Sequence, residues 1–117
     1  MTADYRSATE VAAAVRAGEE SPVALVDRTL DHIASRNDHL NAFVTVLDEE
    51  ARERAAAAEA AVEAGEPLGP LHRVPIAIKD LYDFKAGVRN TLGSVPFAHF
   101  VPARAAIPAT ARSNARP

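Results

Sequence analysis

Apolar residues recur at helical spacing near the start of the chain and predict a first short helix. Ser7 and Glu10 suit a capping box at its beginning, and Gly18 is expected to end it after about Ala17. Three apolar positions share its inner face, namely Val11, Ala14 and Val15.

A second helix is predicted from Ser21, a good N-cap, and from Pro22, which suits the first helical position because no backbone N–H is needed there. Apolar residues again recur on one face, at Val23, Val26, Leu30 and Ile33. We expect this helix to end near Arg36, because Asn37 and Asp38 break it.

The next stretch predicts a short strand followed by a third helix. Residues 41–47 are rich in β-branched and aromatic side chains, which are typical of a strand. Asp48 can cap an alanine-rich helix that runs to about Ala64, with Gly65 beyond its end. Glu50 and Arg54 are four residues apart in the favourable order, so the polar side of this helix is interpreted as a solvated face.

Residues 74–79 predict a short buried strand that carries Lys79 to the end of a sheet. Branched apolar residues alternate on one face, at Val74, Ile76 and Ile78. Pro75 restricts the start of the strand to an edge or an unpaired position. A loop over residues 81–87 and a turn over residues 91–94 are predicted to follow.

Lys79 is the candidate catalytic residue, as a base that accepts a proton. A lysine that an apolar strand carries inward loses part of its hydration, which favours the neutral amine and lowers its pKa toward the range where it accepts protons. The alternative is a solvated lysine that pairs with Asp80 or Asp83, and residue chemistry alone favours this alternative.

Composition narrows the possible functions. The chain has 117 residues, at most one small domain, and alanine supplies much of its 48% hydrophobic content, so we expect a thin core. A formal net charge of −3 argues against nucleic acid or an anionic membrane as a direct partner. Neither a signal-like segment nor a membrane-spanning apolar run is present, so we expect a cytoplasmic protein of unknown oligomeric state.

We expect no metal and no cofactor. The absence of cysteine excludes disulfides and thiolate ligands, and no glycine-rich phosphate loop precedes a helix. The histidines lack ligand spacing and are interpreted as surface or capping residues: His32, His39, His72 and His99.

Residues 69–80 read Gly-Pro-Leu-His-x-Val-Pro-Ile-Ala-Ile-Lys-Asp, and residues 86–88, Thr91, Gly93 and Ser94 complete the pattern. This pattern resembles the amidase signature family, and the resemblance extends back through residues 41–46 to Ser21 over about nine-tenths of the chain. One departure is Arg73, where the family usually has glycine, so we expect its bulk and charge to crowd the turn before the strand.

The resemblance implies an α/β fold: N-terminal helices plus short strands of the family's mixed sheet, here incomplete. It also implies that Lys79 is the base of a Ser-Ser-Lys triad, which takes a proton from a bridging serine in a cis peptide, while that serine activates the nucleophilic serine. Asp80, Thr91, Gly93 and Ser94 would support the site, and the complete family acts on a small-molecule amide.

The other triad members are not present in this sequence. In the family they lie on a Gly- and Ser-rich segment downstream of the lysine, and the serines here lie outside any such cluster: Ser7, Ser21, Ser35, Ser94 and Ser113. Because triad groups act as a unit, we expect the chain to be inactive by itself.

Residues 1–102 are predicted to be the N-terminal part of an amidase-type domain, and residues 103–117 an irregular tail. We hypothesise a frameshift near Arg104 or Ala105, since residues 112–117, back-translated with GC-rich codons, read Leu-Glu-Arg-Ala-Ala in another frame. The alternative is a disordered tail.

Three functions remain open at this point. The first is an amidase fragment, which Leu81 favours over the second, a piece of a tRNA-dependent amidotransferase A subunit, where asparagine is common. The third is a small non-catalytic interaction protein that retains the helices and the lysine segment.

Overall fold

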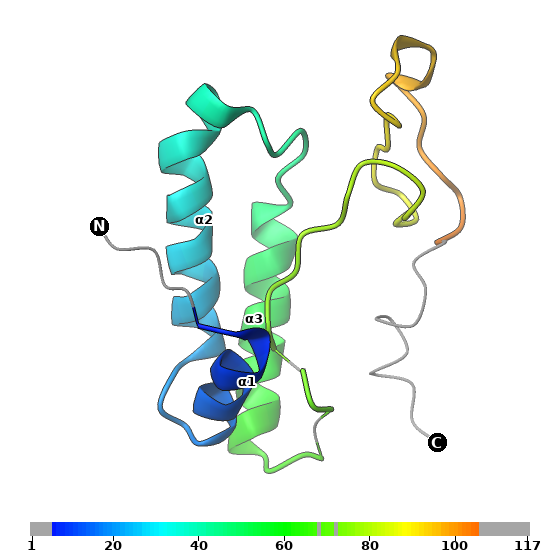
Figure 1. The fold of residues 1–117 in the computed structure, drawn as a ribbon. Helices are drawn as coiled ribbons and strands as arrows, with labels where there is room; N and C mark the ends of the chain where they lie inside the picture. Colours follow the sequence, from blue (N-terminus) through cyan, green and yellow to red (C-terminus); the bar gives the residue numbers. More distant parts are fainter. Residues whose placement is uncertain (1–5, 68, 72, 106–117) are drawn as a thin grey trace. The chain divides into compact units, whose positions relative to one another are not determined.

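The computed structural model describes residues 6–67, 69–71 and 73–105. Its elements are α1 (Ala8–Arg16), α2 (Pro22–Leu40), α3 (Asp48–Glu63) and the short 3-10 helix η1 (Val95–Phe97), as Figure 1 shows. The chain divides into two compact units, Met1–Pro75 and Ile76–Pro117. Among the described helices, none combines the length and the apolar character that a membrane span requires.

Helix α1 begins at the predicted capping box. Ser7 Oγ accepts a hydrogen bond from the Glu10 backbone N–H at 3.2 Å, and Glu10 Oε2 accepts one from the Ser7 N–H at 2.6 Å. The helix ends at Arg16 with Ala17 as its C-cap, just before Gly18 with φ +73°, so both predicted ends are confirmed. Of the three expected inner residues Val15 is buried and the other two are half-buried, while Ala12 is also buried.

Helix α2 begins as predicted but ends later. Ser21 Oγ accepts from the Ala24 N–H at 3.2 Å, and Pro22 occupies the first turn. The expected end near Arg36 is wrong, because the helix continues to Leu40 and closes at Asn41 in the left-handed conformation, φ 49°.

Asn37 does not break α2, because its side chain is used to hold the next segment. Its Oδ1 accepts from the Phe43 N–H at 2.8 Å, and its Nδ2 donates to the Phe43 carbonyl at 2.9 Å. The Asn41 N–H also donates to the Asn37 carbonyl at 2.6 Å. These bonds form the corner between α2 and α3, which we call the Asn37 corner.

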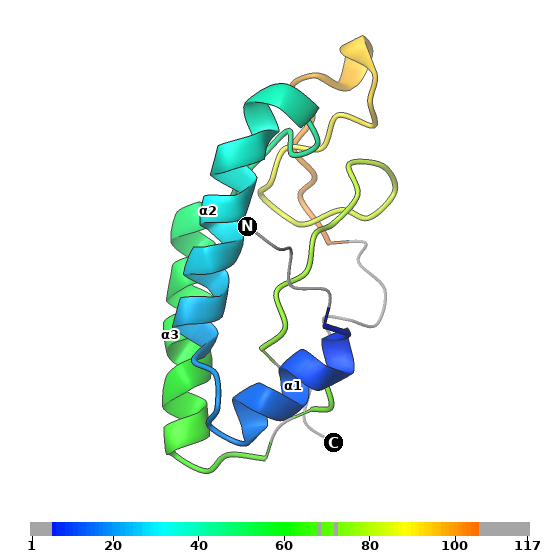
Figure 2. The same cartoon turned by 60° about the vertical axis from the view of Figure 1, so that its left-hand side comes forward.

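Helix α3 lies beside α2 in Figure 1 and Figure 2, and α1 lies at the end of the pair where α2 begins. Among the described residues of this unit the buried side chains are few and mostly small, which agrees with the thin core expected from composition: Ala12, Val15, Pro22, Leu25, Val26 and Ala55. Arg52 donates to Asp27 at 2.9 Å, and Ser21 donates to Glu59, so polar contacts also join α2 and α3.

The bounds of α3 agree closely with the sequence. Asp48 is its first residue rather than its cap, because Leu47 occupies the cap position without a side-chain bond. The Asp48 carboxylate then favours the helix through the macrodipole. The predicted Arg54–Glu50 ion pair forms at 2.8 Å, and Gly65 with φ +67° follows the end of the helix.

The sheet part of the predicted α/β fold does not form in the described residues. Residues 41–47 and 74–79 contain no assigned strand, and both strand predictions are wrong for this chain. In the first segment, Asn41 and Phe43 form hydrogen bonds with Asn37 at the Asn37 corner rather than with a strand. The second has no neighbouring strand to pair with among the described residues, and its side chains Ile76 and Ile78 are 64% and 41% exposed rather than buried.

An ion cluster around the half-buried Glu20 gives a pH-dependent prediction. Its carboxylate lies 2.8 Å from Arg6 and also bonds Arg28, and its side chain is only 11% exposed. Burial raises the pKa of Glu20, but the hydrogen bonds and charges of Arg28 and Arg6 outweigh burial and hold this pKa below its ordinary value. The cluster therefore stabilises the folded unit when Glu20 is ionised.

Glu20→Gln is expected to lower stability at pH 7 by about 1 kcal/mol. Because the folded pKa is depressed, this contribution is complete above the unfolded value of about 4.3 and is lost as pH falls through the folded pKa. Thermal melts followed by circular dichroism should therefore show the wild type and the variant converging in acid. The matched control is Glu19→Gln at an exposed neighbour, and an equal shift for that variant would contradict the prediction.

Candidate functional site

The second unit contains a turn that Asp80 holds in place. Asp80 Oδ1 accepts from the Thr91 backbone N–H at 2.7 Å, and Oδ2 accepts from the Thr91 hydroxyl. The Ser94 N–H donates to the Thr91 carbonyl at 2.9 Å, and the Gly93 N–H donates to Thr91 Oγ1 at 3.2 Å. The predicted turn over residues 91–94 is confirmed, and we call this set of contacts the Asp80 clamp.

The electrostatics of the clamp favour an ionised Asp80. The side-chain hydrogen bond from Thr91 is the largest influence and holds the pKa of Asp80 below its ordinary value; burial opposes it. Backbone N–H groups of Thr91 and Leu92 and the positive charge of Arg89 add to the lowering. An anionic carboxylate that accepts two hydrogen bonds from the same residue is a firm local anchor.

The clamped turn is conformationally demanding. Leu92 and Gly93 both have positive φ, 53° and 63°, and a non-glycine residue in this region costs about 1–2 kcal/mol. Asn90, which is buried, supports the turn: its Oδ1 accepts from the Leu92 N–H at 3.3 Å, and its N–H donates to the Phe100 carbonyl at 3.0 Å. Several hydrogen bonds therefore determine the turn together.

Aromatic contacts complete this unit. The Phe100 ring meets Phe84 and Phe97 edge to face, with centroids 5.8 and 6.1 Å apart. The Gly87 N–H donates to the carbonyl of buried Pro102 at 3.0 Å. The predicted loop over residues 81–87 is confirmed and is tied back to the end of the unit.

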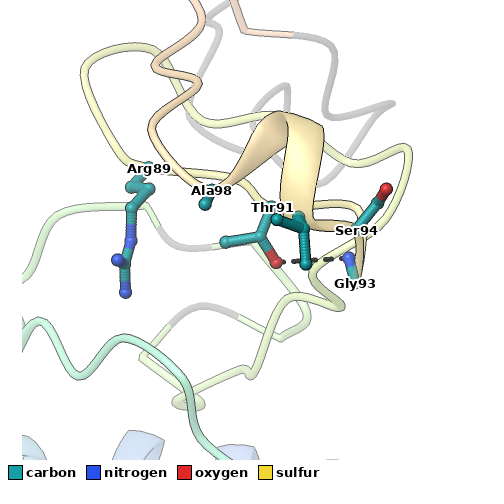
Figure 3. A pocket seen from close by; sticks show the side chains of 6 residues that line it. Arg89, Thr91, Gly93, Ser94 and Ala98 are labelled. Atoms are coloured by element: carbon teal, nitrogen blue, oxygen red, sulfur yellow. Dashed lines mark hydrogen bonds between the residues drawn. The ribbon is translucent and has the colours of Figure 1, made fainter.

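An open pocket of about 290 Å³ lies over the clamped turn. Its lining, shown in Figure 3, includes three predicted site residues and three that sequence reasoning did not identify: Thr91, Gly93, Ser94, Arg89, Val95 and Ala98. The structure therefore brings Thr91, Gly93 and Ser94 together and joins Asp80 to them. Asn90 and Arg89 belong to no sequence motif. The only sequence signal near them was the predicted turn over residues 91–94.

Lys79 is exposed and follows an exposed extended segment, so the expected buried strand around it is wrong for this chain. Lys79 is not buried because no described helix or loop covers residues 76–79. The alternative pairing with Asp80 or Asp83 is not formed either, since Asp80 bonds Thr91 and, in the described part of the chain, no hydrogen bond or ion pair involves the Lys79 side chain. Nothing in the described residues removes water from this amine.

Arg73, the one departure from the family pattern, has φ +74°, a region that favours glycine. Its Nε donates to the Ala58 carbonyl at 2.6 Å, while its Nη2 is buried and has no hydrogen-bond partner among the described residues. Burial lowers the pKa of Arg73, and Glu66 opposes this effect. The expected crowding therefore takes a definite form: a strained backbone and a partly desolvated guanidinium.

Replacement of Arg73 can separate these two effects. Arg73→Gly is expected to be more stable than Arg73→Ala by about 1 kcal/mol, because both lose the bond to Ala58 but only glycine adopts this φ without strain. Urea unfolding of the two variants measures the difference. Equal stabilities would mean that residue 73 leaves the left-handed region when the guanidinium is removed.

The described residues contain no group of three His, Asp or Glu side chains that could hold a metal ion. His72 and residues 106–117, which include Ser113 and most of the expected irregular tail, lie outside the described residues.

Comparisons with known proteins agree on one family. A family model described as Amidase matches residues 24–110. The A subunit of the glutamyl-tRNA(Gln) amidotransferase of Salinispora arenicola is 43% identical over 88 residues, which are 75% of this chain and 18% of that protein. An amidase of Pseudomonas putida is 42% identical over 85 residues, which are 73% of this chain and 18% of that protein.

A solved structure is also similar. The crystal structure of a bacterial aryl acylamidase, an amidase signature enzyme, matches with a TM-score of 0.78 and 39% identity over 85% of this chain and 20% of that chain. The chain thus spans about a fifth of the length of the proteins that it matches.

Proposed function

The chain belongs to the amidase signature family, and we propose that it supplies the lysine-bearing N-terminal part of an amide-hydrolysing enzyme. One observation carries the proposal. The stretch that matches the family, residues 24–110, contains Lys79 and the complete Asp80 clamp beside it. Lys79 is the proposed base, and Asp80, Thr91, Gly93 and Ser94 are its proposed supports.

Amide hydrolysis needs a nucleophile, a base, donors for the oxyanion and a pocket for the acyl group. In the proposed triad, Lys79 accepts a proton from a bridging serine as that serine takes one from the nucleophilic serine. The nucleophile then forms a bond to the amide carbon, the C–N bond breaks, and the amine leaves with a proton returned through the same relay. Water, deprotonated through that relay, next cleaves the acyl–serine ester, which releases the carboxylic acid and restores the serine hydroxyl. Of these groups, this chain offers the base.

The base role requires that Lys79 be covered. Only a neutral amine accepts a proton, and removal of water favours that form of lysine. Because Lys79 is exposed in this chain, the covering residues must come from the rest of an amidase domain. We therefore propose that the chain alone does not hydrolyse amides.

A chimera tests this function. Residues 21–102 replace the matching segment of the Pseudomonas putida amidase, so that this chain's lysine and clamp stand in a complete domain. We expect the chimera to release ammonia from a simple carboxamide and the purified 117-residue chain to release none. Hydrolysis by the chain alone, or none by the chimera, would contradict the proposal.

A piece of the A subunit of a tRNA-dependent amidotransferase is a second candidate, because several of the similar proteins carry that name. Leu81 favours the amidase. The two candidates differ in the chemistry of the complete enzyme. A second chimera places the same residues in the Salinispora arenicola protein and is assayed for the activity of that protein. If it retains a larger share of its parent's activity than the amidase chimera does, the second candidate is favoured. A non-catalytic interaction protein is a third candidate.

A further inference from the structure

We infer that the pocket over the clamped turn receives an anionic group of the substrate, and that Arg89 is the residue that selects this group. The substrate class is an amide that also carries a carboxylate, such as the monoamide of a short dicarboxylic acid. The inference rests on the proposed function, because it names the substrate of the same site. It goes further, since the proposed mechanism specifies no substrate and gives Arg89 no role.

The lining of the pocket has a positive charge. Of the six described residues that line it, Arg89 is ionised and the others are neutral. The Asp80 carboxylate is not part of the lining, and both of its oxygens accept hydrogen bonds from Thr91. A pocket with a guanidinium and no acid in its described lining favours an anion over a neutral or a cationic group.

Arg89 and Ser94 supply the polar groups that a carboxylate needs. A guanidinium has five N–H donors, so it can bind a carboxylate through two of them and keep contacts within the protein. Ser94 adds a hydroxyl, and no hydrogen bond involves this hydroxyl within the described part of the chain. In the view of Figure 3, Arg89 and Ser94 lie on opposite sides of Thr91. A ligand that spans the pocket therefore meets the guanidinium on one side and a hydroxyl on the other.

The size and the apolar lining of the pocket favour a small aliphatic ligand. Its volume is about 290 Å³, close to the lower limit of about 300 Å³ for small-molecule sites. Val95 and Ala98 provide apolar surface, and Val95 is 88% exposed, so it gains contact when aliphatic carbons cover it. A short carbon chain between a carboxylate and an amide fits this lining.

The pocket is connected to the residue beside the proposed base. Asp80 follows Lys79 in the sequence, and its carboxylate holds Thr91, which lines the pocket. All of these residues belong to the second unit. A contact with one end of a substrate restricts the orientation of the other end, so a carboxylate bound at Arg89 helps to orient the amide for reaction.

Binding to the 117-residue chain tests the pocket without catalysis. The probe is succinamate, and succinamide is its neutral counterpart of nearly equal size. In NMR titrations of the isotope-labelled chain, succinamate is expected to cause saturable shifts at Arg89 Nε and at the Gly93 and Ser94 amides. Succinamide should bind about tenfold more weakly or worse, because it lacks the charged hydrogen bond. An absence of saturable shifts with succinamate, or equal affinity for both probes, would overturn the inference.

Three variants separate a contact in the pocket from a general effect of charge. Arg89→Gln is expected to lower the affinity for succinamate about tenfold or more, and Arg89→Lys, which keeps the charge, to lower it less. Lys85→Gln removes a cation of the same unit that does not line the pocket, and it should bind like the wild type. An unchanged Thr91 amide signal in each variant verifies that the turn is intact. An equal loss in Lys85→Gln would contradict the inference.

The chimera distinguishes a failure of this inference from a failure of the proposed function. Arg89→Gln is expected to lower the ratio of kcat/KM for succinamate to kcat/KM for succinamide about tenfold or more, and Lys85→Gln to leave this ratio unchanged. Hydrolysis of both amides with a ratio that Arg89→Gln does not alter would overturn the inference and leave the proposed function intact. Saturable binding of succinamate to the chain, together with an inactive chimera, would overturn the proposed function, while the carboxylate pocket would stand.

Discussion

Lys79→Met in the chimera is expected to lower kcat/KM for a simple carboxamide by about 10³-fold or more, because removal of one member of a catalytic triad removes most of the activity of the whole. Methionine keeps much of the length and apolar stem of lysine but has no basic nitrogen. The loss should fall on kcat rather than on substrate binding. Steady-state kinetics with ammonia detection measures both.

Two further variants separate a base from a mere positive charge. Lys79→Arg keeps the charge, but a guanidinium does not give up its proton in proteins, so this variant should be as inactive as Lys79→Met. Lys85→Met is the matched control, since Lys85 is the other lysine of the chain and lies in the loop beyond the segment. Substantial activity in Lys79→Arg, or an equal loss in Lys85→Met, would assign another role to Lys79.

Asp80→Ala is expected to release the clamped turn and to reduce kcat of the chimera roughly 10–100-fold, because a misplacement of about 1 Å near a reacting centre has effects of this size. The alanine leaves both Thr91 donors without the carboxylate, a loss of about 2 kcal/mol of local stability. Faster amide exchange at Thr91 and Leu92 in the isolated chain would report the release directly.

Asp83→Ala is the matched control for this variant. Asp83 is a half-buried carboxylate three residues away, and no hydrogen bond or ion pair involves it in the described residues.

Because the pKa of Asp80 is lowered, the clamp should persist above about pH 3.9 and open only as pH falls through the lower folded value. Opening of the turn at neutral pH in the wild type would contradict this account.

The helix starts could be predicted because their causes are local in the sequence. Ser7 with Glu10, and Ser21 with Pro22, place caps within four residues of the N–H groups that they satisfy. The end of α2 was mispredicted because Asn37 acts on Phe43, six residues away, and that contact exists only once the chain has turned. Asn37 disfavours a helix by propensity, but its side-chain hydrogen bonds to Phe43 are formed while it lies inside α2.

The strand segments could not be predicted correctly from pattern alone, because a strand is completed by its neighbours. Val74, Ile76 and Ile78 have the right alternation, but alternation specifies only which face an added sheet would cover. In the part of the chain that the structure describes, Ile76 and Ile78 are both exposed, and Lys79 is exposed with them. The alternation therefore predicted a strand whose neighbours the described residues do not supply.

The resemblance singled out residues that the structure brings together, and their catalytic role stays a prediction. The resemblance identified Asp80, Thr91, Gly93 and Ser94, and the structure joins them through the Asp80 clamp and the pocket above it. Buried Asn90 was missed because a single asparagine in a turn has many possible roles. The unusual Arg73 was noticed only as a departure from a pattern, and its positive φ supplies the physical reason why glycine is usual there.

The Asn37 corner has a consequence for how this part of the fold can vary. A single side chain bonds both the N–H and the carbonyl of Phe43, so the path between them has a set length. The intervening positions can change in composition, provided that the left-handed conformation at Asn41 is retained. An insertion or deletion there, however, would shift the start of α3 out of register with α2, so natural length variation should be found elsewhere in the chain.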